Sequence, residues 1–113
     1  MIETTVLDHL QPALSVPVYM EYPDRAPESF VVVRKVDDSP DEHINYAAFV
    51  LWCYGGSELG CAQLCQQAID AVDSLNALPQ IVRCEHDSDY TDPDERHKRN
   101  RYKAEFDITY YRD

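Results

Sequence analysis

The sequence predicts an α+β protein in which two helices pack on a mixed, mainly antiparallel sheet, in the order α-β-β-β-α-β-β. Three observations lead to this class. Two stretches repeat apolar residues at helical spacing, several segments are rich in β-branched and aromatic residues, and the last segment alternates apolar and polar residues. The length of 113 residues suits a single domain, 1–113, whose thin core leaves room for a shallow pocket at most.

The first half of the chain supplies one helix and three strands. Apolar residues at helical spacing predict a helix over 2–11, and the segments 16–22 and 30–36 have the composition of strands. The polar, acidic stretch 37–43 is expected to be a solvated loop. The nearly unbroken apolar run 46–54 then predicts a central strand that is buried on both faces.

The second half supplies one helix and two strands. A helix over 57–76 begins after Ser57, a favoured N-cap residue, and carries an apolar stripe along one side. The segment 81–85 predicts a short strand, and the alternation over 102–110 predicts a strand with one buried and one solvated face. The segment 85–95 holds six carboxylates and no base, so we expect a solvated acidic loop.

The charge balance excludes several classes of function. The chain has 21 acidic and 10 basic residues, a net charge of −11, which repels a phosphate backbone, so specific binding to nucleic acid is not expected. No apolar run approaches the roughly 18 residues of a membrane span. The first residues include Glu3 where a signal peptide needs bases, so we expect a soluble protein made in the cytosol.

The cysteines Cys53, Cys61, Cys65 and Cys84 are expected to be reduced and to pack in the core, because they fall on apolar stripes. A zinc site that these thiols form with His86 is the alternative. No nucleophile elbow, P-loop or dinucleotide fingerprint occurs, and we expect neither enzymatic activity nor a metal or cofactor.

The acidic segment 85–95 resembles a calcium loop only in part. Asp87, Asp89 and Thr91 imitate its first three ligands. Asp92 stands where the sharp turn needs a glycine, and Lys98 stands where a bidentate glutamate belongs. The segment is therefore interpreted as a solvated acidic stretch and not as a metal site.

A basic block follows the acidic segment directly. Half of the 10 basic residues lie in it: Arg96, Lys98, Arg99, Arg101 and Lys103. The block either compensates the neighbouring carboxylates or docks on an acidic surface of another subunit. Because adjacent blocks of opposite sign in one strand connection cannot pair fully with each other, we expect pairing between neighbouring subunits.

Several stretches together resemble the tail terminator or tail completion proteins of long-tailed bacteriophages, which join the tail to the head. The matching stretches are 2–10, 16–23, 30–33, 54–57, 62–64, 101–102 and 106–108. The resemblance implies two helices against a sheet, and a structural virion protein at the head–tail junction. It implies a closed homo-oligomeric ring, commonly a hexamer, that ends polymerisation of the tail tube and binds the tube protein and the head connector.

These expectations single out two groups of residues. The candidate subunit or partner interface consists of Arg96, Lys98, Arg99, Arg101, Asp87, Asp89, Asp92, Asp94 and Glu95. The candidate lining of a lumen through which DNA passes consists of Asp37, Asp38, Asp41 and Glu42. Two other functions stay open at this point: a non-viral interaction module of the same fold, and a regulator or enzyme with a Cys/His metal site.

Overall fold

The computed structural model describes residues 1–40 and 43–111, with the side chain of Pro40 left out. In this part of the chain two α-helices, one 3-10 helix and five strands follow the predicted order, and the α+β class is confirmed. The elements are α1 (Ile2–Ala13), β1 (Val18–Tyr19), β2 (Phe30–Pro40), β3 (Ile44–Gly55), α2 (Glu58–Asp73), η1 (Ser74–Ala77), β4 (Ile81–Thr91) and β5 (Asn100–Tyr111).

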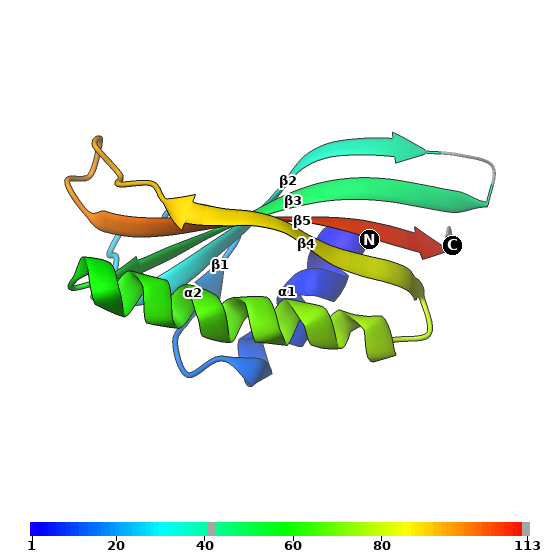
Figure 1. Cartoon of the computed structure of the whole chain (residues 1–113), viewed down its shortest axis with the longest axis horizontal. Coiled ribbons are helices and arrows are strands. Elements are labelled where there is room, and N and C mark those ends of the chain that lie inside the picture. Colours follow the sequence, from blue (N-terminus) through cyan, green and yellow to red (C-terminus); the bar gives the residue numbers. More distant parts are fainter. Residues whose placement is uncertain (41–42, 112–113) are drawn as a thin grey trace.

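The strands form one mixed sheet in the order β1-β2-β3-β5-β4. Only β1 and β2 run parallel, and the other neighbours are antiparallel. Both helices lie on the same side of this sheet, which leaves the other side open (Figure 1). The turn between β4 and β5 lies at one end of the molecule, and the C-terminal end of β2 lies at the other.

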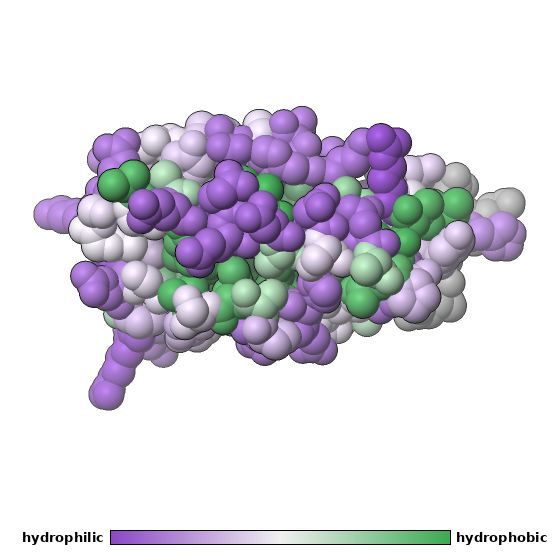
Figure 2. Space-filling model, turned by 60° about the horizontal axis from the view of Figure 1, so that its bottom comes forward, coloured by the Kyte–Doolittle hydropathy of each residue, from purple (hydrophilic) through white to green (hydrophobic). Residues whose placement is uncertain are grey.

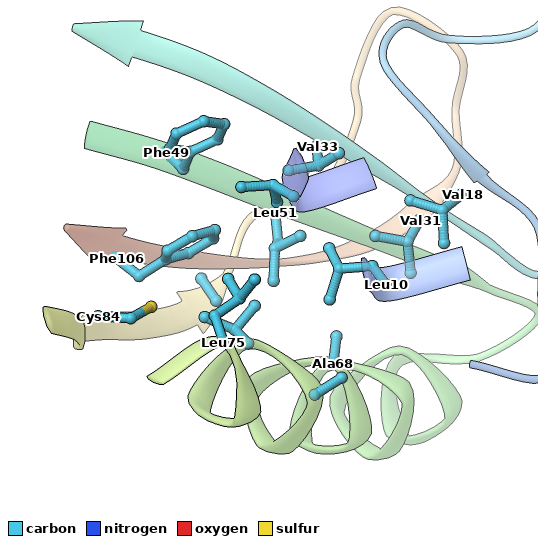
Figure 3. Close-up of a cluster of buried hydrophobic side chains, with 14 of the residues drawn as sticks. Leu10, Val18, Val31, Val33, Phe49, Leu51, Ala68, Leu75, Cys84 and Phe106 are labelled. Atoms are coloured by element: carbon cyan, nitrogen blue, oxygen red, sulfur yellow. The ribbon is translucent and has the colours of Figure 1, made fainter. Parts of the chain in front are cut away.

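The main core lies between the helices and the sheet (Figure 3). Ile2, Val6 and Leu10 of α1 are buried there, one helical turn apart, as their spacing predicts. The strands contribute their alternate residues, such as Phe49 and Phe106, whose rings stack with centroids 5.5 Å apart. Hydrophilic side chains cover much of the outer surface on the helix side, with smaller hydrophobic areas between them (Figure 2).

The N-terminus of α2 and the end of η1 are fixed by side chains. The backbone N–H of Gly60 donates to the Ser57 hydroxyl at 3.0 Å, which confirms the predicted cap. The predicted helix over 57–76 ends as an α-helix at Asp73 and continues as η1. There the Asn76 side chain bonds both the N–H and the C=O of Cys84, at 2.8 and 3.0 Å, and so ties η1 to β4.

All four cysteines are buried and free, so the predicted core positions are confirmed. Burial raises the pKa of the Cys84 thiol to about 12, with further contributions from Asp73 and other nearby carboxylates. A thiol with so high a pKa stays protonated at neutral pH and is a poor nucleophile. Its packing is therefore its evident role.

Three loop and strand predictions are wrong. The strand predicted at 16–22 is reduced to β1, because the chain from Met20 onward leaves the sheet edge and crosses its open face. Residues 37–40 are not a loop but the end of β2, paired with β3. Residues 85–91 are likewise not a loop but the second half of β4, paired with β5. Both acidic segments are outer strands whose side chains face solvent, which hides them from a pattern of apolar residues.

Among the described residues, no helix is both long enough and apolar enough to cross a membrane.

Candidate functional site

A hollow of about 380 Å³ opens on the open face of the sheet, between the segment that follows β1 and the turn between β4 and β5. We call it the basic hollow, because arginines from three separate segments reach it. Its lining consists of Glu21, Tyr22, Val32, Arg34, Trp52, Tyr54, Asp94, Arg96, His97 and Arg101. An adjoining depression shares five of these residues and adds Pro23 and Asp24.

The floor of the basic hollow is built from neighbouring strands in register. Val32 of β2 lies opposite Trp52 of β3, and the next rung on the same face places Tyr54 opposite Arg101 of β5. The Arg101 guanidinium carbon lies 5.6 Å from the centre of the Trp52 ring and 5.9 Å from that of Tyr54, within the range of cation–π attraction. The floor is therefore aromatic and carries a fixed positive charge.

The indole N–H of Trp52 is buried and has no hydrogen-bond partner among the described residues. A buried donor without an acceptor costs free energy, so such donors are usually paired. Trp52 lines the basic hollow, and the described chain supplies no acceptor for this N–H. The floor thus holds an unused donor beside the guanidinium groups.

One wall is the turn between β4 and β5, which Asp94 holds together. Asp94 and Arg99 exchange two backbone hydrogen bonds of 3.0 Å that close the turn. The Asp94 carboxylate accepts from the Tyr54 hydroxyl at 2.7 Å and from the backbone N–H of His97 at 3.1 Å, and the Nδ1 atom of His97 lies 2.8 Å away. A buried carboxylate with these contacts fixes the turn to the floor of the hollow.

These contacts decide the ionisation of the network. Burial opposes the charge on Asp94, but hydrogen bonds from Tyr54 and His97 outweigh it and lower the pKa of Asp94 to about 2. Burial, together with the hydrogen bond to Asp94, raises the pKa of Tyr54 to about 12. At neutral pH the Asp94 carboxylate is therefore charged and the Tyr54 phenol is neutral, so the hydroxyl can donate its hydrogen bond to the carboxylate.

The opposite wall is the segment that crosses the open face after β1. The Tyr22 ring stacks on the His97 ring, with centroids 3.7 Å apart and the planes 8° from parallel. Tyr22 also packs edge-on against Phe30 and Tyr54, at centroid distances of 5.5 and 5.4 Å. Together these contacts close a second, smaller core beneath the hollow and hold its two walls together.

Five of the predicted interface residues are used within the subunit: Asp89, Asp92, Asp94, Arg99 and Arg101. Arg101 donates to the carbonyl of Asp92 at 2.7 Å and to its carboxylate at 3.1 Å, and its NH1 atom lies 3.7 Å from Asp94. Arg99 donates to the carbonyls of Pro27 and Glu28. Of the two blocks, Arg101 pairs with Asp92 and lies near Asp94, because the chain reverses at 94–99 and brings these opposite charges face to face. This local pairing is partial, and the expectation of pairing between subunits stays a prediction.

The other residues of the turn point outward. Glu95, Arg96 and Lys98 are exposed and form no hydrogen bond or ion pair with another described residue through their side chains. Lys98 has a φ of 53°, the left-handed conformation that tightens the turn. Of these three residues only Arg96 lines the basic hollow.

Sequence reasoning missed Arg34, Tyr22 and Trp52. Arg34 is exposed, follows Val32 on the same face of β2, and forms no ion pair among the described residues. Each of the three lies far in sequence from the basic block, and each was assigned only to a strand. These residues come together because the segment after β1 crosses the open face of the sheet. No local sequence pattern indicates that path.

The outermost strand, β4, carries acidic residues that do not line the basic hollow. We call Glu85, Asp87 and Asp89 the acidic edge; all three are exposed. Asp89 accepts from the Tyr102 hydroxyl and lies 3.0 Å from His86, and Glu85 pairs with Arg83. Asp87 lies in an irregularity of the β4–β5 register between His86 and Ser88 and forms no ion pair with another described residue.

The candidate lumen residues lie away from the basic hollow. Asp37 and Asp38 are exposed on β2, and Asp38 pairs with Lys35 at 2.9 Å. Asp37 shares a row across the sheet with Ala48 and Asp107. Burial, and then the nearby acids, raise the pKa of Asp107. Asp41 and Glu42 lie outside the described residues.

The arrangement suits binding of an anionic group. The basic hollow offers the guanidinium groups of Arg34 and Arg96, which suit a carboxylate or another anion. Within residues 1–40 and 43–111, no three His, Cys, Asp or Glu side chains come together in a way that could hold a metal ion. No family model and no curated protein matches the chain.

Proposed function

We propose that the protein is a ring-forming structural subunit of a bacteriophage tail, which ends polymerisation of the tail tube and provides the surface that joins tail and head. The observation that carries this proposal is that the subunit has two separate charged surfaces of opposite sign. The acidic edge lies on β4, the outermost strand, and its residues do not line the basic hollow. The arginines of the hollow come from β2, β5 and the turn between β4 and β5.

A subunit with two different, complementary sides suits a cyclic assembly. In a closed ring each subunit presents one patch to its left neighbour and another to its right neighbour, and no patch is left over. Opposite charges across each joint favour this head-to-tail contact and disfavour contact between two like sides. A two-fold dimer would pair the same two patches reciprocally, so the oligomeric state measured by sedimentation distinguishes it from a ring.

The ends of the molecule are then available for partners. The acids of β2, Asp37 and Asp38, do not line the basic hollow; they follow Arg34 by three and four residues on the same strand, and we assign them to a lumen through which DNA passes without binding. The tail tube protein and the head connector are the partners on the two faces of the ring, and six copies is the number that the resemblance implies. The ring belongs to the virion and is made in the host cytoplasm.

Two measurements test this function. Sedimentation velocity of the purified protein, alone and with tail tube protein, is expected to show a discrete closed oligomer. Tube protein that polymerises in the presence of the ring is expected to give shorter tubes with one capped end in electron micrographs. A protein that stays monomeric in both conditions, or tubes of unchanged length, contradicts the proposal.

A further inference from the structure

We propose that the basic hollow is a carboxylate-binding site, and that its occupant is the Asp87 side chain on the acidic edge of a second copy of this chain. The inference rests on the proposed ring and assigns the contact that closes it. The basic side of this contact consists of Arg34 and Arg96. Arg34 was not part of the interface predicted from the sequence, and Lys98, Arg99 and Arg101 of that interface are not used in the contact.

The hollow has donors in excess of acceptors. Arg34 and Arg96 line it, and neither forms an ion pair with another described residue. The buried N–H of Trp52 also lacks an acceptor within the described chain. Two carboxylates also line the hollow, but Asp94 is engaged by Tyr54 and His97, so Glu21 is the one that remains beside Arg34 and Arg96. The three arginines of the lining therefore outnumber its carboxylates, and a further carboxylate matches the planar guanidinium geometry.

The hollow is held open in advance of binding. The Asp94 network fixes the turn that carries Arg96, and the Tyr22–His97 stack fixes that turn against the opposite wall. Arg34 extends from β2, which is paired with β3 at this position. A site whose walls are already ordered loses less conformational entropy when the ligand enters.

Among the described acids of the acidic edge, Asp87 fits this site best. It is exposed, it has no ion-pair partner among the described residues, and the register irregularity between His86 and Ser88 turns it out of the regular ladder. A second irregularity lies between Ile81 and Arg83. Bulges on an outer strand hinder the addition of another strand, so we expect neighbouring copies to meet through side chains and not through a continuous sheet.

Charge reversal of each side tests the joint. Arg96→Glu places an acid opposite Asp87, and Asp87→Arg places a base opposite Arg34 and Arg96, so each variant alone is expected to sediment as a folded monomer. The double variant in one chain restores opposite charges and is expected to regain the ring. An equimolar mixture of the two single variants is expected to form a ring in which they alternate.

Lys98→Glu is the matched control. Lys98 lies in the same turn and is exposed, but it does not line the hollow, so this variant is expected to keep the ring. Circular dichroism of every variant checks that it is folded. If the ring still forms in both Arg96→Glu and Asp87→Arg, or if Lys98→Glu disrupts it to the same extent, this inference is overturned. The proposal that the wild type forms a ring is not affected by either outcome.

A second measurement tests the hollow without assembly. Trp52 is the only tryptophan, so its fluorescence reports directly on the hollow. The probe is a capped peptide with the sequence of residues 85–91, titrated into the monomeric Asp87→Arg variant. A saturable change in Trp52 emission is expected, and it is expected to vanish with Arg34→Ala or with a peptide that has Asn in place of Asp87 and Asp89.

The two measurements separate the possible failures. A peptide that leaves Trp52 emission unchanged overturns the hollow as a carboxylate site, whatever the oligomeric state. A wild-type protein that stays monomeric at every concentration overturns the ring and, with it, the second copy as occupant. Peptide binding together with recovery of the ring by the double variant supports the inference in full.

Discussion

Asp94 joins the turn between β4 and β5 to the floor of the hollow, although it is a charged residue in a buried position. Its side chain is 6% exposed. Three groups converge on the carboxylate: the Tyr54 hydroxyl, the backbone N–H of His97 and the His97 ring. A buried charge is tolerated only when its hydrogen bonds are made, and here β3 and the turn supply them.

We therefore expect Asp94→Ala to lower the free energy of unfolding by roughly 2–4 kcal/mol, because it leaves the Tyr54 hydroxyl without its acceptor and the Arg101 charge less compensated. Asp94→Asn is expected to cost less, since the amide oxygen still accepts. Urea denaturation followed by circular dichroism measures both. Glu95→Ala, an exposed neighbour, is the control, and an equal loss in that variant contradicts the assigned role of Asp94.

The same network predicts a dependence of stability on pH. The pKa of Asp94 is lowered from 3.8 to about 2, so its stabilising contribution is complete above pH 3.8 and is lost as the pH falls through 2. A shift of this size corresponds to roughly 2 kcal/mol. The urea midpoint of the wild type is expected to fall more steeply in this acid range than that of Asp94→Asn, and parallel curves contradict the assignment.

At the level of the elements, a pattern in the sequence is informative where one face is buried. The helices are predicted at nearly their observed positions, because their apolar residues repeat at helical spacing, and β3 is, because its apolar run is nearly unbroken. The end of β2 and the second half of β4 were taken for loops. Their side chains are exposed and acidic, and what holds them in strands is backbone pairing with β3 and β5, which leaves no trace in hydropathy.

The candidate site was predictable to a similar extent. Arg96 was named from the clustering of bases in sequence, and Asp87 from the clustering of acids. Arg34 and Trp52 were not, because they join the hollow only when β2, β3 and the turn are assembled. Pairing between Arg101 and Asp92 was missed for the same reason: it requires the chain to reverse between them.

Helix α2 allows a direct test of the core assignment of the cysteines. Cys65 is 1% exposed and faces the sheet. Cys65→Ala is expected to cost roughly 1–2 kcal/mol through lost contacts, whereas Cys65→Asp is expected to cost several kcal/mol because it buries an unpaired carboxylate. Thermal unfolding measures both, with Gln66→Ala on the exposed side of α2 as the control. Loss of structure on chelation of metal contradicts the assignment and favours a zinc site.

At the scale of the whole molecule, acidic and basic side chains gather on separate surfaces. The molecule measures 43 Å along its longest axis and about 25 Å across. The acidic edge lies on β4, the outermost strand, and the basic hollow lies on the open face beside the turn between β4 and β5. Asp37 and Asp38 follow Arg34 toward the end of β2, which points away from that turn (Figure 1). A ring closed through the sides can therefore direct the β2 ends toward its centre without using them in the joints.

This arrangement predicts that the acids of 37–42 keep DNA from binding to the ring. Their charge acts over about a Debye length, roughly 8 Å at physiological salt, which is enough to repel a duplex in a narrow lumen. Replacement of Asp37, Asp38, Asp41 and Glu42 by Lys is expected to leave the ring intact in sedimentation. It is also expected to make the ring retard short duplex DNA in a gel-shift assay, which the wild type is not expected to do. The same four substitutions to Asn and Gln are the control, and they are expected to give weak retardation or none. A Lys variant that forms the ring but does not retard DNA contradicts the lumen assignment, because positive charges that line the path of the duplex must attract its phosphates.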